Sequence, residues 1–318
     1  MADTLATRSR PALRAGWMQD YGVYVALAAI LLVNLLITEH FVTVSNLRTQ
    51  LVQVVPVLII GLGMSLVIGT EGIDLSVGSV MALATALLPL YLGYGALPGI
   101  VTALLAGLAV GALNGWLVAY VGVQPIVATL ALLVGGRGLA TVIGGAQKDI
   151  HNQTLLDIGA NEVGGVPIIV GIAALLTIVV SFVVRKTTFG RQLVAVGGNR
   201  IASELGGLPV KRILITVYVL SGVLAAVAGV IATARLTAST PNTLGLNVEL
   251  SAITAVVVGG TPLTGGRVRI LGTVAGAILM QLIRSTLIAH DLHDSAAQMV
   301  QAAIILIAVY AQRGRART

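Results

Sequence analysis

The chain has 318 residues, of which 57% are hydrophobic and only 10% are charged. A soluble globular domain carries about 25% charged residues, so this composition excludes an ordinary soluble protein and indicates one that uses lipid as its solvent. The absence of cysteine excludes a disulfide framework, thiol catalysis and a thiolate metal site. The net charge of +7 is spread over loops between apolar segments, which argues against a nucleic-acid partner.

The first twenty residues are polar, and an apolar run follows from Tyr21 to Ile37. No cleavage pattern of small residues comes after this run, so it does not match a removed signal peptide. We therefore expect a retained transmembrane helix behind a cytoplasmic tail, 1–20.

Crossing a bilayer takes about twenty apolar residues. The pattern predicts an all-α polytopic membrane protein with a transmembrane domain, 21–311, and a cytoplasmic basic tail, 312–318. About ten spans are predicted, at 21–38, 50–69, 77–93, 97–120, 125–145, 166–184, 213–235, 249–261, 270–289 and 296–311. Broken or short helices are expected around 70–79 and 249–266, because glycines and polar residues interrupt the apolar pattern there.

Lys and Arg favour the cytoplasmic side of a membrane. Most of the 19 basic residues fall on one side if ten spans place both the N- and the C-terminus in the cytoplasm. The same arrangement puts a polar loop, 146–165, outside and a basic loop, 185–212, inside. Within the inner loop, the sequence predicts a short helix from Asn199 to Leu205, with Asn199 as its N-cap and Gly206 and Gly207 ending it. This loop either docks a cytoplasmic partner or is a solvated segment that only fixes topology.

Two glycine-rich interruptions, 70–79 and 259–266, carry hydroxyl groups and free backbone N–H groups suited to a neutral polyol. Irregular backbone at membrane depth is tolerated only beside protein or a water-filled cavity. Asp74 and Ser76 could equally cap the following helix. Elsewhere, glycines at every fourth position favour close helix packing, at Gly107, Gly111 and Gly115 and again at Gly272 and Gly276.

Arg137 lies within a predicted span, where a cation costs at least ~2.5 kcal/mol. It either lines a polar path or bonds to helix-end carbonyls, and Glu249 is one possible partner. Three amides, Asn114, Gln124 and Gln281, are either interhelical hydrogen-bonding groups or ligands for a polyol.

No P-loop, zinc-protease or serine-hydrolase motif occurs, and the four histidines form no metal set. We therefore expect no catalytic residue, no metal and no cofactor bound by this chain. The lack of a carboxylate in the middle of any predicted span argues against proton coupling.

Seven segments carry distinctive motifs: 72–79 (GIDLSVGS), 124–130 (QPIVATL), 136–140 (GRGLA), 188–191 (TFGR), 195–199 (AVGGN), 249–261 (ELSAITAVVVGGT) and 263–266 (LTGG). In the same order, from about residue 47 to 311, the chain resembles ribose-type sugar permeases of bacterial ABC importers, with galactofuranose-type permeases the nearest group. One departure is Ser251, where the family usually has Asp; this leaves Glu249 without its acidic neighbour.

The resemblance implies a monosaccharide permease in the bacterial inner membrane, dimeric with itself or with a close paralogue. Cytoplasmic subunits would hydrolyse ATP with Mg, and an extracytoplasmic sugar-binding protein would deliver substrate. Residues expected to dock the ATPase are Gly190, Arg191, Gly197, Gly198, Asn199, Arg200, Ala202, Glu204 and Gly206. Residues expected along the substrate path are Asp74, Ser76, Asn114, Gln124, Arg137, Glu249 and Thr261.

Two other transport functions remain open at this point. An ion-coupled secondary sugar transporter also uses broken helices near the membrane midplane. An ABC permease for another small solute, such as a branched-chain amino acid, would share the docking loop. An intramembrane enzyme lacks a credible catalytic set.

Overall fold

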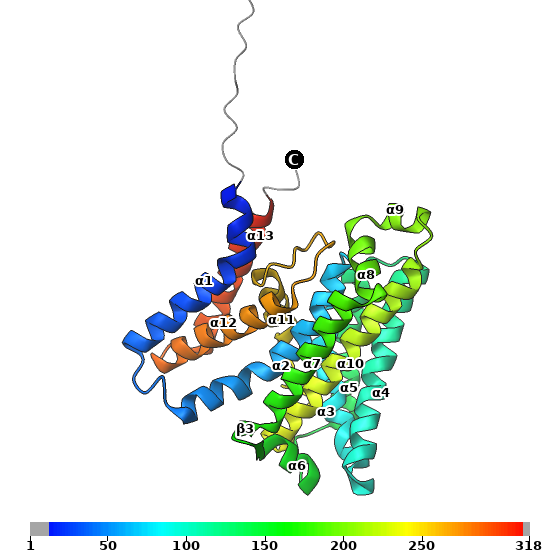
Figure 1. Ribbon diagram of the computed structural model, residues 1–318. Coiled ribbons are helices and arrows are strands. Elements are labelled where there is room, and N and C mark those ends of the chain that lie inside the picture. Colours follow the sequence, from blue (N-terminus) through cyan, green and yellow to red (C-terminus); the bar gives the residue numbers. More distant parts are fainter. Residues whose placement is uncertain (1–12, 314–318) are drawn as a thin grey trace, which may run out of the picture.

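A computed structural model describes residues 13–313 (Figure 1). The long helices are α1 (Leu13–Ile37), α2 (Val44–Gly69), α3 (Val77–Tyr91), α4 (Ala96–Trp116), α5 (Pro125–Gly144), α7 (Ile168–Lys186), α10 (Val210–Leu236), α12 (Ile270–Ala289) and α13 (Asp294–Arg313). Shorter helices are η1 (Leu92–Tyr94), the π-helix η2 (Leu117–Val121), α6 (Gln153–Ala160), α8 (Thr188–Gly198), α9 (Arg200–Leu205) and α11 (Val248–Val258). Most of the predicted tail 1–20 and of the basic tail 312–318 lies outside the described residues.

Two short antiparallel strand pairs complete the secondary structure of this part of the chain. Strand β1 (Lys148–Asp149) pairs with β4 (Ala238–Ser239), and β2 (Glu162–Val163) pairs with β3 (Val166–Pro167). The first pair ties the predicted outer loop to the end of α10.

Within residues 13–313, seven helices are long and apolar enough to cross a membrane, which confirms the helical membrane-protein class. They span Val44–Gly69, Val77–Tyr94, Ala96–Val121, Pro125–Gly144, Ile168–Lys186, Val210–Leu236 and Ile270–Ala289. Helices α1, α11 and α13 occupy the positions of the other three predicted spans. Helix α11 has only 11 residues, so the expected short helix is confirmed. The count of about ten crossings and the cytoplasmic termini stay predictions.

Helix α10 lies among α2, α3, α4 and α6. Three glycines of α4 rest directly on its backbone, at Gly107, Gly111 and Gly115. A Cβ atom on Gly111 would be 2.8 Å from Cα of Val219, and one on Gly115 would be 2.7 Å from Cα of Ile215. The predicted glycine-mediated packing of this span is therefore confirmed.

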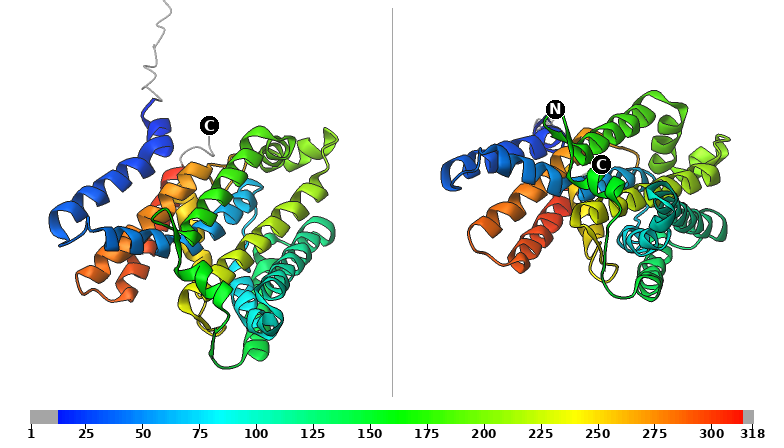
Figure 2. Two further views of the ribbon diagram at one scale, coloured as in Figure 1. Left: turned by 60° about the horizontal axis from the view of Figure 1, so that its bottom comes forward. Right: turned by 90° about the horizontal axis from the view of Figure 1, so that it is seen from below.

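A second helix group contains α1, α11, α12 and α13, which α2 joins to the helices around α10 (Figures 1 and 2). Gly272 of α12 lies against the backbone of Gly259, and Gly276 lies against that of Ala255. These contacts let α11 and α12 approach closely, as their small residues predicted.

The predicted inner loop is mostly helical, which differs from the expectation of a long loop before Asn199. Helix α8 forms because Thr187 accepts a hydrogen bond from the Gly190 N–H at 3.4 Å and because Leu193 and Val196 are buried on one face. The short helix after it is confirmed as α9, where Asn199 accepts a hydrogen bond from the Ala202 N–H at 2.9 Å.

Helices α4, α5 and α7 expose apolar side chains on the faces turned away from α10. Examples are Leu108 at 44%, Val134 at 69% and Ile178 at 66% exposed. An exterior of this kind suits contact with lipid tails rather than with water.

Replacement of Gly111 by Ala is expected to destabilise the protein, because the new Cβ meets the α10 backbone. Overpacking of this kind costs about 1–3 kcal/mol. Thermal unfolding in detergent should show a lower Tm for Gly111→Ala. The matched control is Gly171→Ala in α7, where a Cβ meets nothing within 4 Å and where the higher helix propensity of alanine favours folding. Equal Tm values for both variants would contradict direct backbone contact between α4 and α10.

Candidate functional site

The link between α2 and α3 carries a buried polar network around Asp74. This side chain is only 1% exposed. Its Oδ1 accepts hydrogen bonds from the Ser76 N–H at 3.0 Å and the Ser76 hydroxyl at 2.6 Å. Its Oδ2 accepts one from the Ser221 hydroxyl of α10 at 2.8 Å. The carboxylate therefore fixes the beginning of α3 to the middle of α10.

Asn114 of α4 joins the same network by donating to the Ser76 hydroxyl oxygen at 2.8 Å. Its Oδ1 and the Tyr218 hydroxyl are buried without a hydrogen-bond partner among the described residues. The Tyr218 hydroxyl lies against Gly72, where a Cβ would be 2.7 Å away. Tyr218 and Ser221 did not stand out in the sequence. The available signal was the presence of two hydroxyl side chains close together in an otherwise apolar span.

The structure supports a helix-capping role for Asp74 but not for Ser76. Asp74 accepts a backbone N–H near the beginning of α3, as expected of a capping carboxylate. Ser76 occupies the N-cap position but makes no side-chain capping bond, because its hydroxyl is used by Asp74 and Asn114.

Arg137 of α5 donates to the carbonyl oxygens of Leu244 at 2.7 Å and Gly245 at 2.9 Å. These contacts support the interpretation that the guanidinium bonds to backbone carbonyls. No ion pair with Glu249 is found in the part of the chain that the structure describes. Both charged groups nevertheless lie next to Gly78, two residues after Ser76. The Glu249 Oε2 atom is buried without a hydrogen-bond partner in the same described part.

Two expected path residues lie elsewhere. Thr261 is fully buried and accepts a hydrogen bond from the Arg269 N–H at 3.0 Å. Gln124 is exposed at the beginning of α5. The other five expected path residues gather at the beginning of α3, inside a single chain. Their arrangement fixes helices relative to one another, and a role in a substrate path stays a prediction.

A different polar surface lies across α2, α11, α12 and α13. Each of three helices supplies two polar side chains at i and i+3, a spacing that places both on one helix face. The pairs are Gln50 and Gln53 on α2, Gln281 and Arg284 on α12, and Gln298 and Gln301 on α13. We call this surface the amide groove. It includes a cavity of about 120 Å³, and of its residues only Gln281 stood out in the sequence.

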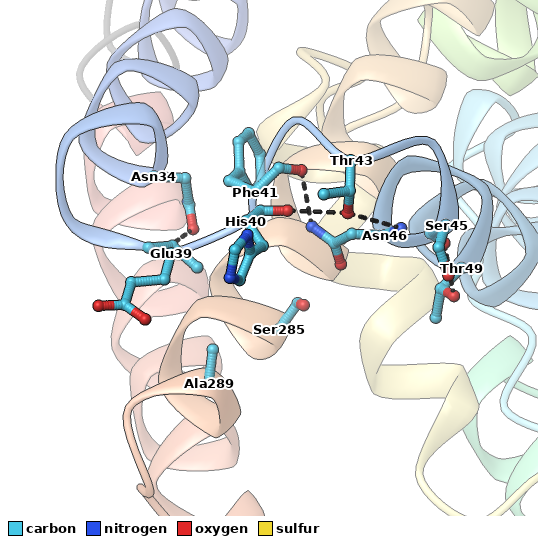
Figure 3. Close-up of a pocket in the computed structure, with 11 residues that line it drawn as sticks. Asn34, Glu39, His40, Phe41, Thr43, Ser45, Asn46, Thr49, Ser285 and Ala289 are labelled. Carbon is cyan, nitrogen blue, oxygen red and sulfur yellow. Dashed lines mark hydrogen bonds between the residues drawn. The ribbon is translucent and has the colours of Figure 1, made fainter.

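A larger cavity of about 380 Å³ lies between the α1–α2 turn and the end of α12. Figure 3 shows that polar groups of the turn surround it. Their bonds are largely local: Asn46 donates to the Phe41 carbonyl at 2.8 Å, and Thr38 donates to Asn34 at 2.9 Å. None of the expected path residues lines it, so we assign it to the structure of the turn.

The residues expected to dock an ATPase divide into two sets. Gly190 and Gly197 are buried on α8. The others are exposed: Arg191, Gly198, Asn199, Arg200, Ala202, Glu204 and Gly206. Figure 1 shows α9 standing away from the helix bundle. Its apolar side chains Ile201 and Leu205 are 73% and 85% exposed.

Replacement of Asp74 by Ala is expected to lower the unfolding free energy by about 3 kcal/mol or more, because each buried donor left without an acceptor costs about 1–3 kcal/mol. Chemical unfolding in detergent measures the change. The matched control is Asp149→Ala, which removes an exposed carboxylate and should leave stability unchanged. Wild-type stability of Asp74→Ala would show that the network does not hold α3 to α10.

Comparisons with known proteins give a consistent family. A family model described as a branched-chain amino acid transport system permease component matches residues 46–309. The galactofuranose transporter permease protein of Escherichia coli (strain K12) is 36% identical, covering 99% of this chain and 96% of the relative. The ribose import permease protein of the same strain is 36% identical, covering 92% of this chain and 93% of the relative. The fructose import permease protein of Bifidobacterium longum (strain NCC 2705) is 40% identical, covering 82% of this chain and 75% of the relative.

No solved structure matches the chain. The family match nevertheless covers most of the described helices, including the Asp74 network, the inner helices α8 and α9 and the amide groove. The chain therefore belongs to the family of membrane permease components of transport systems, and its relatives are the sugar permeases of ABC importers.

Proposed function

We propose that this chain translocates a monosaccharide by alternating access, driven by separate ATP-binding subunits. The chain is a transport component rather than an enzyme, so ATP and Mg are used by its partners. The names of its relatives supply the substrate class: they are permeases for ribose, galactofuranose and fructose. A second copy or a close paralogue completes the membrane unit, and an extracytoplasmic binding protein delivers the sugar.

The exposed apolar face of helix α9 is the observation that supports the proposal of an ATPase partner. Ile201 and Leu205 lie on one face of this helix and are among the most exposed apolar side chains described. Charged residues border them, with Arg200 before Ile201 and Glu204 before Leu205, in the segment that the Lys and Arg distribution places in the cytoplasm. Exposed apolar side chains outside a membrane mark protein interaction sites when polar residues border them.

Helix α8 connects this surface to both glycine-rich interruptions. Gly197 lies against the Gly69 carbonyl at the end of α2 and the Gly266 N–H of the later interruption. The Gly266 N–H also donates to the Gly69 carbonyl at 3.1 Å. A force on α9 therefore reaches α2 and the 259–266 segment through direct backbone contact, which supports transmission from the ATPase to the spans.

The description of the family names branched-chain amino acids, which is the main alternative substrate class. The described lining of the amide groove holds one cation, Arg284, and no acidic residue. It therefore offers a partner for the carboxylate of an amino acid but none for its ammonium group. The names of the relatives carry the preference for a neutral sugar over an amino acid and over an ion-coupled mechanism.

Replacement of both Ile201 and Leu205 by Asp is expected to abolish binding of the ATP-binding subunit, because the two charges replace the apolar contact face of α9. The tagged chain is purified from its native membranes, and co-purifying proteins are identified and tested for ATP hydrolysis. We expect a stoichiometric partner with a P-loop for the wild-type chain and its loss from the double variant.

The matched control is Val163→Asp on β2, which charges an apolar side chain that is 74% exposed in the predicted outer loop. This variant should retain the partner. An ATPase that co-purifies equally with the α9 double variant would contradict docking at α9. Recovery of the wild-type chain without any ATPase would contradict the importer proposal itself.

A further inference from the structure

Polar side chains are concentrated on the amide groove, whereas the exposed faces of several other spans are mostly apolar. Helices α4, α5 and α7 expose leucine, isoleucine, valine and phenylalanine, whereas the groove exposes Gln53, Arg284 and Gln298. Polar side chains within membrane segments are costly against lipid and face the bundle interior or a water-filled cavity. The groove therefore requires a polar environment that a lipid tail cannot supply.

Hydrogen bonds within the groove connect four helices in two pairs. Gln281 donates to Gln53 at 2.7 Å and to Gln50 at 3.2 Å, joining α12 to α2. Gln301 donates to Ser251 at 3.2 Å and to Thr254 at 3.3 Å, joining α13 to α11. One interhelical bond is worth only about 0.6 kcal/mol, so helix association alone is a weak reason to place so many amides on one surface.

The chemistry of the groove matches a neutral hydroxylated solute. A glutamine side chain offers two N–H donors and a carbonyl acceptor, so it can bond to a sugar hydroxyl in either role. The lining contains no acidic residue among those described, so it provides no carboxylate for an ammonium group or a metal ion. Several weak, exchangeable hydrogen bonds suit a path that must both admit and release its substrate.

The groove also lies in the correct part of the helices for delivery from outside. Gln50 and Gln53 occupy the first half of α2, Gln281 and Arg284 the second half of α12, and Gln298 and Gln301 the first half of α13. These halves all lie towards the side opposite α8 and α9. A solute entering from that side meets the groove before it reaches the glycine-rich interruption at 259–266.

We infer that the amide groove over α2, α11, α12 and α13, rather than the buried Asp74 network, lines the path of the sugar. This inference rests on the proposed function, since it assigns a site to the proposed substrate. It also gives Gln53, Gln281 and Gln298 the role of binding residues.

Water access to the groove can be tested directly, because the chain contains no cysteine. Single-cysteine variants Gln53→Cys, Gln281→Cys and Gln298→Cys are assembled in the full complex and treated with the charged reagent sulfonatoethyl methanethiosulfonate. The thiolate is the reactive form and needs water to form, so we expect these variants to react about tenfold or more faster than a lipid-facing thiol. The control is Ile178→Cys on α7, whose side chain is 66% exposed to the surroundings. Added substrate sugar should slow the reaction in the groove only.

Transport supplies the second measurement. Gln53→Leu and Gln281→Leu keep similar side-chain size but remove hydrogen-bonding groups, and each should lower uptake by about tenfold. Radiolabelled D-ribose, D-fructose, D-galactose and D-allose serve as probes in the assembled importer. Co-purification of the ATPase should remain at wild-type level. The matched control is Gln153→Leu in α6, an exposed glutamine outside the groove.

The outcomes separate the two proposals. Wild-type uptake by both groove variants, or groove thiols that react no faster than Ile178→Cys, would overturn the assignment of the path. Efficient cross-linking of groove cysteines between two copies, without protection by sugar, would show that a second chain covers the groove and would also overturn it. If the wild-type complex imports none of the four sugars, the monosaccharide proposal fails, and the labelling experiment still decides whether the groove holds water.

Discussion

Helix α10 meets α3 and α4 at glycines, where backbone lies directly against backbone. Gly222 and the adjoining turn meet Gly107 and Gly111 of α4, and Gly229 meets the backbone of Met81 in α3. Contacts this close leave little freedom in helix position, because a closely packed interior has no space to absorb a shift. They set Ser221 opposite Asp74 at hydrogen-bond distance, so the irregular backbone before α3 keeps its polar partners within the apolar bundle.

This packing produces three chemically distinct regions. The Asp74 network is sealed inside one chain, the outer faces of α4, α5 and α7 are apolar, and the amide groove is polar and accessible. Both carboxylate oxygens of Asp74 are hydrogen-bonded, and satisfied buried groups of this kind stabilise a single arrangement, whereas accessible amides can exchange one partner for another. The beginning of α3 is therefore held rigidly, whereas the face formed by α2, α12 and α13 can exchange its hydrogen-bond partners.

The sequence predicted features that depend on local chemistry. Asn199 predicted the beginning of α9, and Gly272 predicted the close approach of α12 to α11, because a cap or a missing side chain acts over one turn. The sequence could not predict that Arg137 bonds to the Gly245 carbonyl, since 108 positions separate the two residues. The amide groove was missed for the same reason: each i,i+3 pair is unremarkable alone, and only the packing of three helices places them together. Helix α8 was missed because its apolar face is short and because three glycines, Gly190, Gly197 and Gly198, lie within it.

The junction of Gly69, Gly197 and Gly266 has a mechanical consequence. Gly197 meets the Gly69 carbonyl and the Gly266 N–H through main-chain atoms, and the Gly266 N–H donates a hydrogen bond to the Gly69 carbonyl. The side chains of Leu193 and Val268 pack on Gly69 at the same point. A closely packed contact of this kind has no space to absorb a shift, so α8, the end of α2 and the 259–266 segment must move together as one rigid unit.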